Sequence, residues 1–262
     1  MPAAVEGERQ LGQHIRMSFF CALPTQPWSW LSIRTGALVL GGSACAALAQ
    51  PADRVALPNF AIDRTEVTIT QFARFAAAMG SVTRAEHAGG GHEYVGGWQQ
   101  RAGWTWRAPE GTEPTTQQLP AVHLTQGEAQ AYCQWAGGRL PTAAEWISAA
   151  YAEQRVSPPS PWQRGKTYDY PTGDSPQGAN TSAPDAWPRV APAGTTAAGV
   201  NGLLDMGANV WEWASDASGI ERRTMGGSWW YGAPQMRAEV DAWKDADFTA
   251  VYIGFRCVYP NR

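Results

Sequence analysis

The sequence predicts a loop-rich fold in which short helices and short strands share one hydrophobic core. The chain carries 28 Gly and 19 Pro, which favour turns over long regular elements. It also carries 14 Trp, and these large, rigid side chains hold loops in an ordered arrangement. Hydrophobic residues make up 44% and charged residues 16%, so the composition excludes a disordered chain and a coiled coil.

The expected helices are short and carry their own start signals. Residues 68–79 have a helical apolar spacing, with Thr68 as the N-cap and Gly80 as the stop. Residues 125–135 open with a capping-box pattern, and residues 142–150 open with a threonine cap after a proline. The side chains expected to face the core are Phe72, Phe75, Ala76, Met79, Ala129, Tyr132, Cys133, Trp146 and Ala149.

The rest of the chain predicts strands and long loops. Residues 60–67 alternate between apolar and polar side chains, which is typical of a strand, and residues 202–258 indicate several short strands and turns. Residues 81–120 and 152–200 are rich in Gly, Pro and polar side chains, and we expect packed loops held by their tryptophans. Since no repeat or domain boundary is visible, we expect one domain.

The first part of the chain has the pattern of an export signal. A basic residue precedes a short apolar run, and residues 47–49 (Ala-Leu-Ala) form a small-x-small cleavage pattern. We therefore expect residues 1–49 to be a signal peptide or leader and residues 50–262 to be a periplasmic or secreted domain without a membrane span. Three alternatives stay open: a start at Met17, lipidation at Cys45, and an uncleaved N-terminal anchor.

The cysteines support export. Only Cys133 and Cys257 follow the predicted cleavage site. Two distant cysteines in an exported chain most simply form one disulfide, although two buried free thiols are the alternative. The chain-entropy argument gives such a bond roughly 4–5 kcal/mol of stabilisation.

Five sequence blocks occur in order along the chain. They are FAIDRTEVT at 60–68, AYCQWAGGRLPTAAEW at 131–146, GLLDMGANVWEW at 202–213, GGSW at 226–229 and GFRC at 254–257. Together they resemble the formylglycine-generating-enzyme-like (sulfatase-modifying factor) family. The resemblance implies an α+β fold with little regular secondary structure, related to C-type lectins. It also implies that Cys133 and Cys257 form a structural disulfide. An Arg beside a helix start and a Glu inside the helix can pair, so we expect Arg139 and Glu145 to form a buried pair that builds the fold.

The resemblance further implies structural calcium. Hard oxygen ligands near a Gly-rich turn suit Ca²⁺. The first implied set is the side chains of Asp205 and Glu212 with the carbonyls of Ala208 and Val210. The second is the side chains of Asn180 and Asp185 with the carbonyls of Thr181 and Trp187. The alternative is that these carboxylates cap backbone amides.

The copper site of the namesake enzymes is not expected. Those enzymes use two cysteines shortly after Gly-Gly-Ser, and thiolates are what Cu(I) prefers. Carried onto this chain, the two positions fall at about Tyr231 and Met236, and residues 229–237 contain no cysteine. If the chain has another catalytic activity, the candidate catalytic residues are Ser228 and Glu239. The side chains expected to line a cleft are Trp211, Ser228, Trp229, Trp230, Tyr231 and Arg237.

The sequence evidence for a second group of metal ligands is weaker. His87 and His92 lie near Glu86 and Glu93, but in a Gly-rich stretch without a rigid spacing, so we expect a solvated loop.

Three functions follow from these observations. The first is a non-catalytic periplasmic binding protein, because exported relatives without the cysteines include immunity proteins against periplasmic type VI secretion toxins; its partner is then a secreted toxin. The second is a divergent oxidase acting on a small periplasmic substrate, like relatives that mature the siderophore pyoverdine, with Ser228, Tyr231, Arg237 and Glu239 as candidates. The third, a true formylglycine-generating oxidase, needs thiols that the chain lacks. A net charge of −3 without a basic run argues against nucleic-acid binding.

Overall fold

The computed structural model describes residues 53–240 and 242–261. The predicted leader at 1–49, with Met17 and Cys45, lies outside the described residues. Within the described ranges, no helix has the length and apolar character needed to cross a bilayer.

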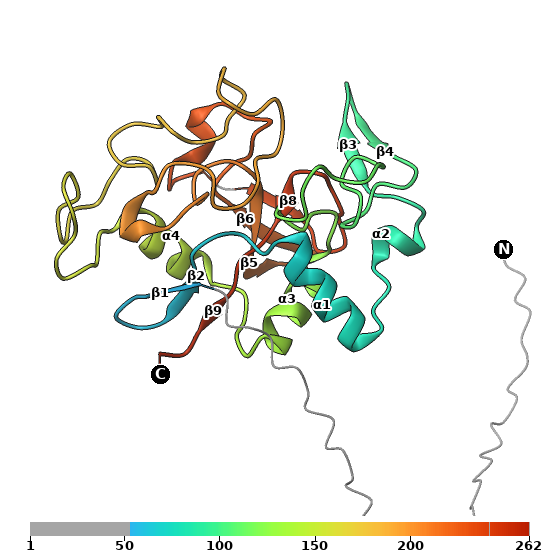
Figure 1. Ribbon diagram of the computed structural model, residues 1–262, viewed down its shortest axis with the longest axis horizontal. Coiled ribbons are helices and arrows are strands. Elements are labelled where there is room, and N and C mark those ends of the chain that lie inside the picture. The colour runs from blue at the N-terminus through green and yellow to red at the C-terminus, as the bar shows by residue number, and fades with distance from the viewer. Residues whose placement is uncertain (1–52, 241, 262) are drawn as a thin grey trace, which may run out of the picture. The chain divides into compact units, whose positions relative to one another are not determined.

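Two small sheets organise the first part of the domain. Strands β1 (Arg54–Ala56) and β2 (Ala61–Asp63) pair antiparallel, and β2 also pairs with β9 (Val258–Tyr259) near the C-terminus. The second sheet is a hairpin of β3 (His92–Tyr94) and β4 (Trp98–Gln100), which stands at the edge of the domain in Figure 1. The first sheet therefore joins the beginning of the domain to its end.

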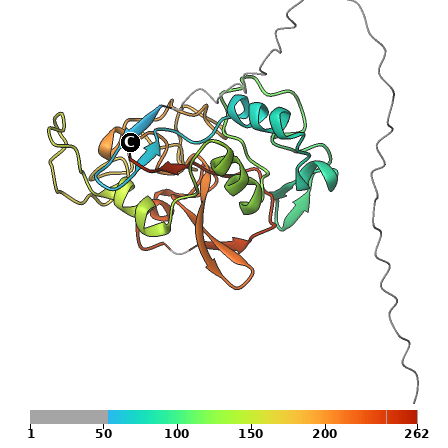
Figure 2. The same cartoon turned by 90° about the horizontal axis from the view of Figure 1, so that it is seen from below.

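The largest sheet has the order β7-β6-β5-β8. Its long members β5 (Trp211–Ser218) and β6 (Glu221–Met225) form a hairpin that Figure 2 shows projecting from the body. Strand β7 (Ala242–Asp245) pairs antiparallel with β6, and β8 (Ile253–Gly254) pairs parallel with β5. The chain between β6 and β7 carries the segment in which the sequence predicts a cleft.

Four short helices cover these sheets. They are α1 (Ile69–Met79), α2 (Arg84–His87), α3 (Gln126–Trp135) and α4 (Ala143–Tyr151). Each begins at a threonine whose hydroxyl accepts from the N3 amide, while the N3 Glu or Gln side chain accepts from the threonine amide. In Figure 1, α1 and α3 lie side by side on one side of β5, and α4 lies on the other. Two 3₁₀ turns follow at η1 (Val200–Gly202) and η2 (Ala233–Met236).

The core is aromatic, as the tryptophan content predicts. Phe72 of α1 packs edge-on against Trp106 with ring centroids 5.0 Å apart, and it also contacts Tyr132 of α3. A second apolar cluster gathers around Trp146 of α4. The predicted inward side chains are buried except Met79, which is 60% exposed. The apolar face of α1 meets the core through Phe72, Phe75 and Ala76, and Met79 lies one turn beyond that contact, next to the stop at Gly80.

Three other expectations are corrected. The segment 81–120 is not all loop, because it contains α2, β3 and β4; short elements of three or four residues leave little periodicity in a sequence. The strand expected at 60–67 is limited to Ala61–Asp63, since the chain then bends toward the cap of α1. Arg139 and Glu145 do pair, at 2.6 Å, but their side chains are 50% and 22% exposed, so the pair lies at the surface.

The predicted disulfide is confirmed. Cys133 of α3 is bonded to Cys257, which immediately precedes β9, across a sequence separation of 124 residues. Both residues are fully buried. The bond therefore ties the C-terminal sheet to the middle of the chain.

Candidate functional site

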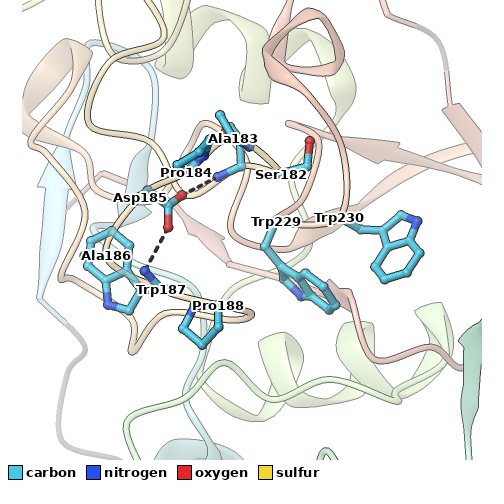
Figure 3. Close-up of a pocket in the computed structure, with 10 residues that line it drawn as sticks. Ser182, Ala183, Pro184, Asp185, Ala186, Trp187, Pro188, Trp229 and Trp230 are labelled. Atoms are coloured by element: carbon cyan, nitrogen blue, oxygen red, sulfur yellow. Dashed lines mark hydrogen bonds between the residues drawn. The ribbon is translucent and has the colours of Figure 1, made fainter.

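An aromatic pocket lies beside the Gly-Gly-Ser-Trp block. Figure 3 shows two walls, the loop at 181–188 on one side and Trp229 with Trp230 on the other. Its volume is about 640 Å³. The lining residues are Thr181, Ser182, Ala183, Pro184, Asp185, Ala186, Trp187, Pro188, Trp229 and Trp230. We call it the tryptophan pocket.

A glycine turn places the two tryptophans. Gly226 and Gly227 have φ angles of +93° and +81°, a region in which L side chains are strained. A Cβ on Gly226 would also lie only 2.9 Å from the Met206 carbonyl oxygen. The turn directs the Trp229 amide onto the carbonyl of Asn209 at 2.8 Å. The Trp230 ring then stands nearly perpendicular to that of Trp229, with centroids 5.4 Å apart.

The opposite wall is held by one carboxylate. Asp185 accepts a hydrogen bond from the Thr181 amide at 3.0 Å and another from the Trp187 amide at 2.8 Å, drawn as dashed lines in Figure 3. The amide of Ser182 donates to the carbonyl of Tyr231 at 3.0 Å, which connects this loop to the segment after Trp230. The loop has no helix or strand of its own, so these contacts set its shape.

A cation lies against the Trp229 ring. The Arg189 guanidinium lies 4.8 Å from the Trp229 ring centroid, and its Nη2 is 2.9 Å from Glu93 Oε1. Its Nε is also 2.7 Å from Glu110 Oε1. Trp229 is 6% exposed and Trp230 is 38% exposed. Trp229 is therefore a fixed part of the wall, and Trp230 presents its ring to solvent.

The structure divides the predicted cleft residues among three places. Trp229 and Trp230 line the tryptophan pocket, while Trp211 and Tyr231 pack against each other with centroids 5.7 Å apart. Arg237 lies over the ring of Tyr170 and donates to its hydroxyl at 3.0 Å. Two prolines of the loop, Pro184 and Pro188, were not among the residues predicted from sequence, and Trp187 was expected only as a carbonyl ligand. A tryptophan and two prolines within five residues are the signal that could have indicated a binding surface.

Protein donors surround the carboxylates of the first implied calcium set. Glu212 accepts from Arg256 Nη2 at 2.7 Å and Nε at 2.8 Å, and from the Trp146 indole at 2.8 Å. Asp205 accepts from the hydroxyl of Thr196 at 2.6 Å and from the amide of Gly194. Both carboxylates therefore accept hydrogen bonds from protein donors, and a guanidinium lies on Glu212. These contacts are compatible with capping by protein donors, and calcium at this first set stays a prediction.

The second implied set has an unsatisfied oxygen. The side-chain amide of Asn180 donates to the Arg189 carbonyl at 2.8 Å and to Asn209 Oδ1 at 3.0 Å, which fixes its orientation. Its Oδ1 is buried and has no hydrogen-bond partner. Thr181 comes next in the chain and its amide binds Asp185. A buried amide oxygen without a donor, close to a carboxylate-bearing loop, fits a hard cation such as Ca²⁺.

Comparison with known proteins identifies the family. The model of the sulfatase-modifying factor enzyme 1-like domain matches residues 23–260, which begins inside the predicted leader. The chain belongs to this family. It therefore has the α+β, C-type-lectin-like fold of formylglycine-generating enzymes, with a modest share of regular secondary structure. Calcium binding is typical of the family.

Relatives in the family differ in activity. A formylglycine-generating enzyme of Thermomonospora curvata is 30% identical, over 79% of this chain and 84% of its own length. The inactive C-alpha-formylglycine-generating enzyme 2 of Mus musculus is also 30% identical, over 79% of this chain and 77% of its own length. Among solved structures, PvdO from Pseudomonas aeruginosa has a TM-score of 0.53 at 22% identity and covers 77% of this chain and 80% of its own. CarF has a TM-score of 0.52 at 21% identity, over 78% and 87%.

The two positions that the sequence matched to the family thiols are both packed. Met236 is fully buried in a small cluster with Ala179 and Ala208. Tyr231 lies between Trp211 and Tyr252, and burial raises the pKa of its phenol. In residues 53–240 and 242–261 every cysteine is in the disulfide.

Ser228 and Glu239 are not brought together as an acid–base pair. Ser228 is 1% exposed; its hydroxyl accepts from the Trp230 amide at 3.4 Å, and its carbonyl accepts from the Tyr231 amide. Glu239 is exposed. Burial raises the pKa of Tyr151, and the charge of Glu239 raises it further, which places Glu239 near that phenol. Ser228 therefore has the contacts of a turn residue.

The histidine group is dispersed. His92 Nδ1 lies 2.9 Å from the Thr249 carbonyl oxygen, while Glu93 pairs with Arg101 at 3.0 Å. Glu86 caps α2 and pairs with Arg107 at 2.9 Å. In the part of the chain that the structure describes, no group of three or more His, Cys, Asp or Glu side chains is arranged to hold a metal.

Proposed function

We propose that this chain is an exported member of the family that binds a protein partner and does not generate formylglycine. The observation that carries the proposal is the pair Tyr231 and Met236, which stand where the resemblance places the two thiols. A phenol with a raised pKa and a buried thioether do not supply the paired thiolates that bind Cu(I). The inactive relative at 30% identity is in line with a family domain that lacks the oxidase activity.

The tryptophan pocket supports binding of a protein. Trp187, Trp229 and Trp230 come from two separate loops and line the same pocket. Tryptophan side chains at the centre of such a surface supply most of the binding energy at protein interfaces. The partner that we propose is a secreted toxin, which the chain neutralises in the periplasm. Calcium held by Asn180, Thr181, Asp185 and Trp187 serves as structural support for this surface.

Substitution of Trp230 tests the binding proposal. The affinity of the purified protein for the toxin encoded at the same locus is measured by calorimetry, beside protection of cells that receive the toxin in the periplasm. Because Trp230 is exposed in the pocket, we expect Trp230→Ala to weaken binding by roughly 30-fold, as for an interface anchor. Trp98→Ala is the matched control, since Trp98 is 44% exposed on the β3–β4 hairpin. Equal affinities of the two variants, or no binding by the wild type, contradict the proposal.

Metal content and oxygen uptake test the oxidase alternative. Protein purified from the periplasm is analysed for copper, iron and calcium by mass spectrometry, and oxygen uptake is followed with a cysteine-containing peptide and with a small aromatic substrate. We expect calcium and no turnover. Stoichiometric copper or iron with turnover that Glu239→Gln abolishes would establish an oxidase and remove the binding-protein proposal.

A further inference from the structure

A second pocket adjoins the tryptophan pocket. Its volume is about 500 Å³, and its lining includes the prolines Pro109, Pro114, Pro188 and Pro192. We call it the proline pocket. Trp187 and Pro188 line both pockets, so these two residues, both labelled in Figure 3, form a ridge between them. The two pockets therefore make one continuous surface, and a single bound segment can contact both.

The walls of the proline pocket are held from more than one side. The carbonyl oxygen of Pro109 lies 2.9 Å from Nε2 of the buried His123. Ala193, which follows Pro192, donates its amide to the carbonyl of Gln118 at 2.9 Å. Proline has a fixed φ angle and no amide hydrogen, so this surface has few conformations to lose when it is bound. The ordering cost of binding here is therefore small.

The charges along this surface are mostly negative. Arg189 supplies the positive charge among the residues that line the two pockets, and two carboxylates share it, Glu110 at 2.7 Å and Glu93 at 2.9 Å. Glu113 also lines the proline pocket and is exposed, without an ion pair to any residue that the structure describes. Asp185 adds a further carboxylate on the other side of the ridge. The surface thus has a negative excess, and Glu113 is a carboxylate that a cation of a partner can reach.

The two pockets differ in what they can bind. The walls of the tryptophan pocket offer the indoles of Trp229 and Trp230, which suit an apolar side chain. The proline pocket combines the apolar side chain of Leu119 with the carboxylate of Glu113. A lysine or arginine side chain matches that combination, because its stem is apolar and its end is charged. The Trp187 indole on the ridge can also attract such a cation to its ring face.

We propose that one extended segment of the protein partner crosses the ridge, with an apolar side chain in the tryptophan pocket and a lysine or arginine side chain reaching Glu113 in the proline pocket. The inference rests on the proposed binding function and names the chemistry of the segment that is bound. Charge complementarity carries it, since the two pockets share a ridge and the carboxylates around them outnumber the one guanidinium.

Reversal of the Glu113 charge tests the electrostatic half. Affinity for the toxin encoded at the same locus is measured by calorimetry at low and at high salt, with wild type and Glu113→Lys. We expect Glu113→Lys to weaken binding by roughly tenfold at low salt and by less at high salt, because salt screens exposed charges. Glu221→Lys is the matched control, at an exposed carboxylate on β6. Equal affinity of the two variants overturns the inference and leaves the binding function standing, whereas absence of binding by the wild type overturns both.

Photo-cross-linking tests whether one segment fills both pockets. Benzoylphenylalanine is placed at Ser182, which lines the tryptophan pocket, or at Thr115, which lines the proline pocket; both residues are exposed. We expect both probes to cross-link to the same proteolytic fragment of the toxin. Replacement of a lysine or arginine in that fragment by glutamate should weaken binding to wild type and restore binding to Glu113→Lys. Cross-links to separate fragments or to a second copy of this chain, or a charge exchange without rescue, overturn the inference.

Discussion

Ionisable side chains are buried where the start and the end of the domain meet. Arg256 is fully buried; it pairs with Glu212 and donates to the carbonyls of Asp63, Arg64 and Leu204. A buried pair gains little stability overall because both charges lose their hydration, but loss of one partner costs about 3–5 kcal/mol. Burial raises the pKa of neighbouring Glu66 well above its usual range, and the Asp205 carboxylate raises it further. The pair of Arg256 and Glu212, with the backbone carbonyls that Arg256 binds, thus fixes the positions of these charged groups.

Asp63 makes a measurable contribution to pH dependence. It is 3% exposed, and burial raises the pKa of its carboxyl from 3.8 to about 6. The folded state therefore binds this proton more tightly than the unfolded chain does. The resulting stabilisation is fully present below pH 3.8 and is lost as the pH rises through about 6.

We expect Asp63→Asn to gain stability relative to wild type as the pH rises from about 4 to about 6, and to keep that gain above it. Urea unfolding of both proteins across this range measures the difference. Burial lowers the pKa of His123 to about 4, which gives the opposite slope, but His123 is present in both proteins and cancels. Asp247→Asn, at an exposed carboxylate, is the control. Parallel curves for wild type and Asp63→Asn would contradict the expectation.

The helices depend on their first turns. The longest has 11 residues, and helices of this length are marginal in water without packing or caps. All four helices that the structure describes begin with a reciprocal capping box. At α3, Glu128 also accepts from the Arg84 amide of α2 at 2.6 Å. The cap of one helix therefore helps to position the next.

We expect Thr125→Ala to lower the free energy of unfolding by about 1 kcal/mol, because the Glu128 amide then loses the hydroxyl that accepts its hydrogen bond. Denaturant unfolding at constant pH measures the loss. Thr112→Ala, at an exposed loop position, should change stability by less than about 0.5 kcal/mol. A loss at Thr125 no larger than that of the control would show that packing alone holds α3.

On the scale of the whole molecule, covalent and hydrogen-bonded links join distant parts of the chain. The sheet β1-β2-β9 and the Cys133–Cys257 bond both act on the C-terminal segment. The long irregular segment at 152–200 contributes the pocket loop without any long regular element. In such a fold the cross-link restricts the unfolded chain, since it closes a loop across 124 residues.

We expect the double variant Cys133→Ala and Cys257→Ala to lose about 5 kcal/mol of stability, which is the chain-entropy value for a loop of this length. Alanine avoids an unpartnered hydroxyl at two buried positions. Urea unfolding of the variant is compared with oxidised wild type and with wild type in dithiothreitol, which should match the variant. A loss below about 1 kcal/mol would show that the packed aromatic core, and not the disulfide, supplies most of the stability.

The sequence by itself determined the features that depend on neighbouring residues. Capping at Thr68, Thr125 and Thr142 needs partners only three positions away, so the starts of three helices were predictable. The disulfide was predictable because only two cysteines follow the leader pattern, and the five ordered blocks were sufficient for the family. The short elements within 81–120 were not predictable, since they depend on contacts such as that of His92 with Thr249.

Only the tertiary structure decided how the candidate site is arranged. In sequence, Asp205, Glu212 and Asp185 are equally good candidates for calcium ligands. The fold, however, brings Arg256 onto Glu212 and leaves the side-chain oxygen of Asn180 without a hydrogen-bond donor. It also pairs Arg237 with Tyr170 and sets the loop at 181–188 opposite Trp229. The physical reason is that the environment of a buried polar atom is set by groups far away in sequence, and burial then determines which of them must find a partner.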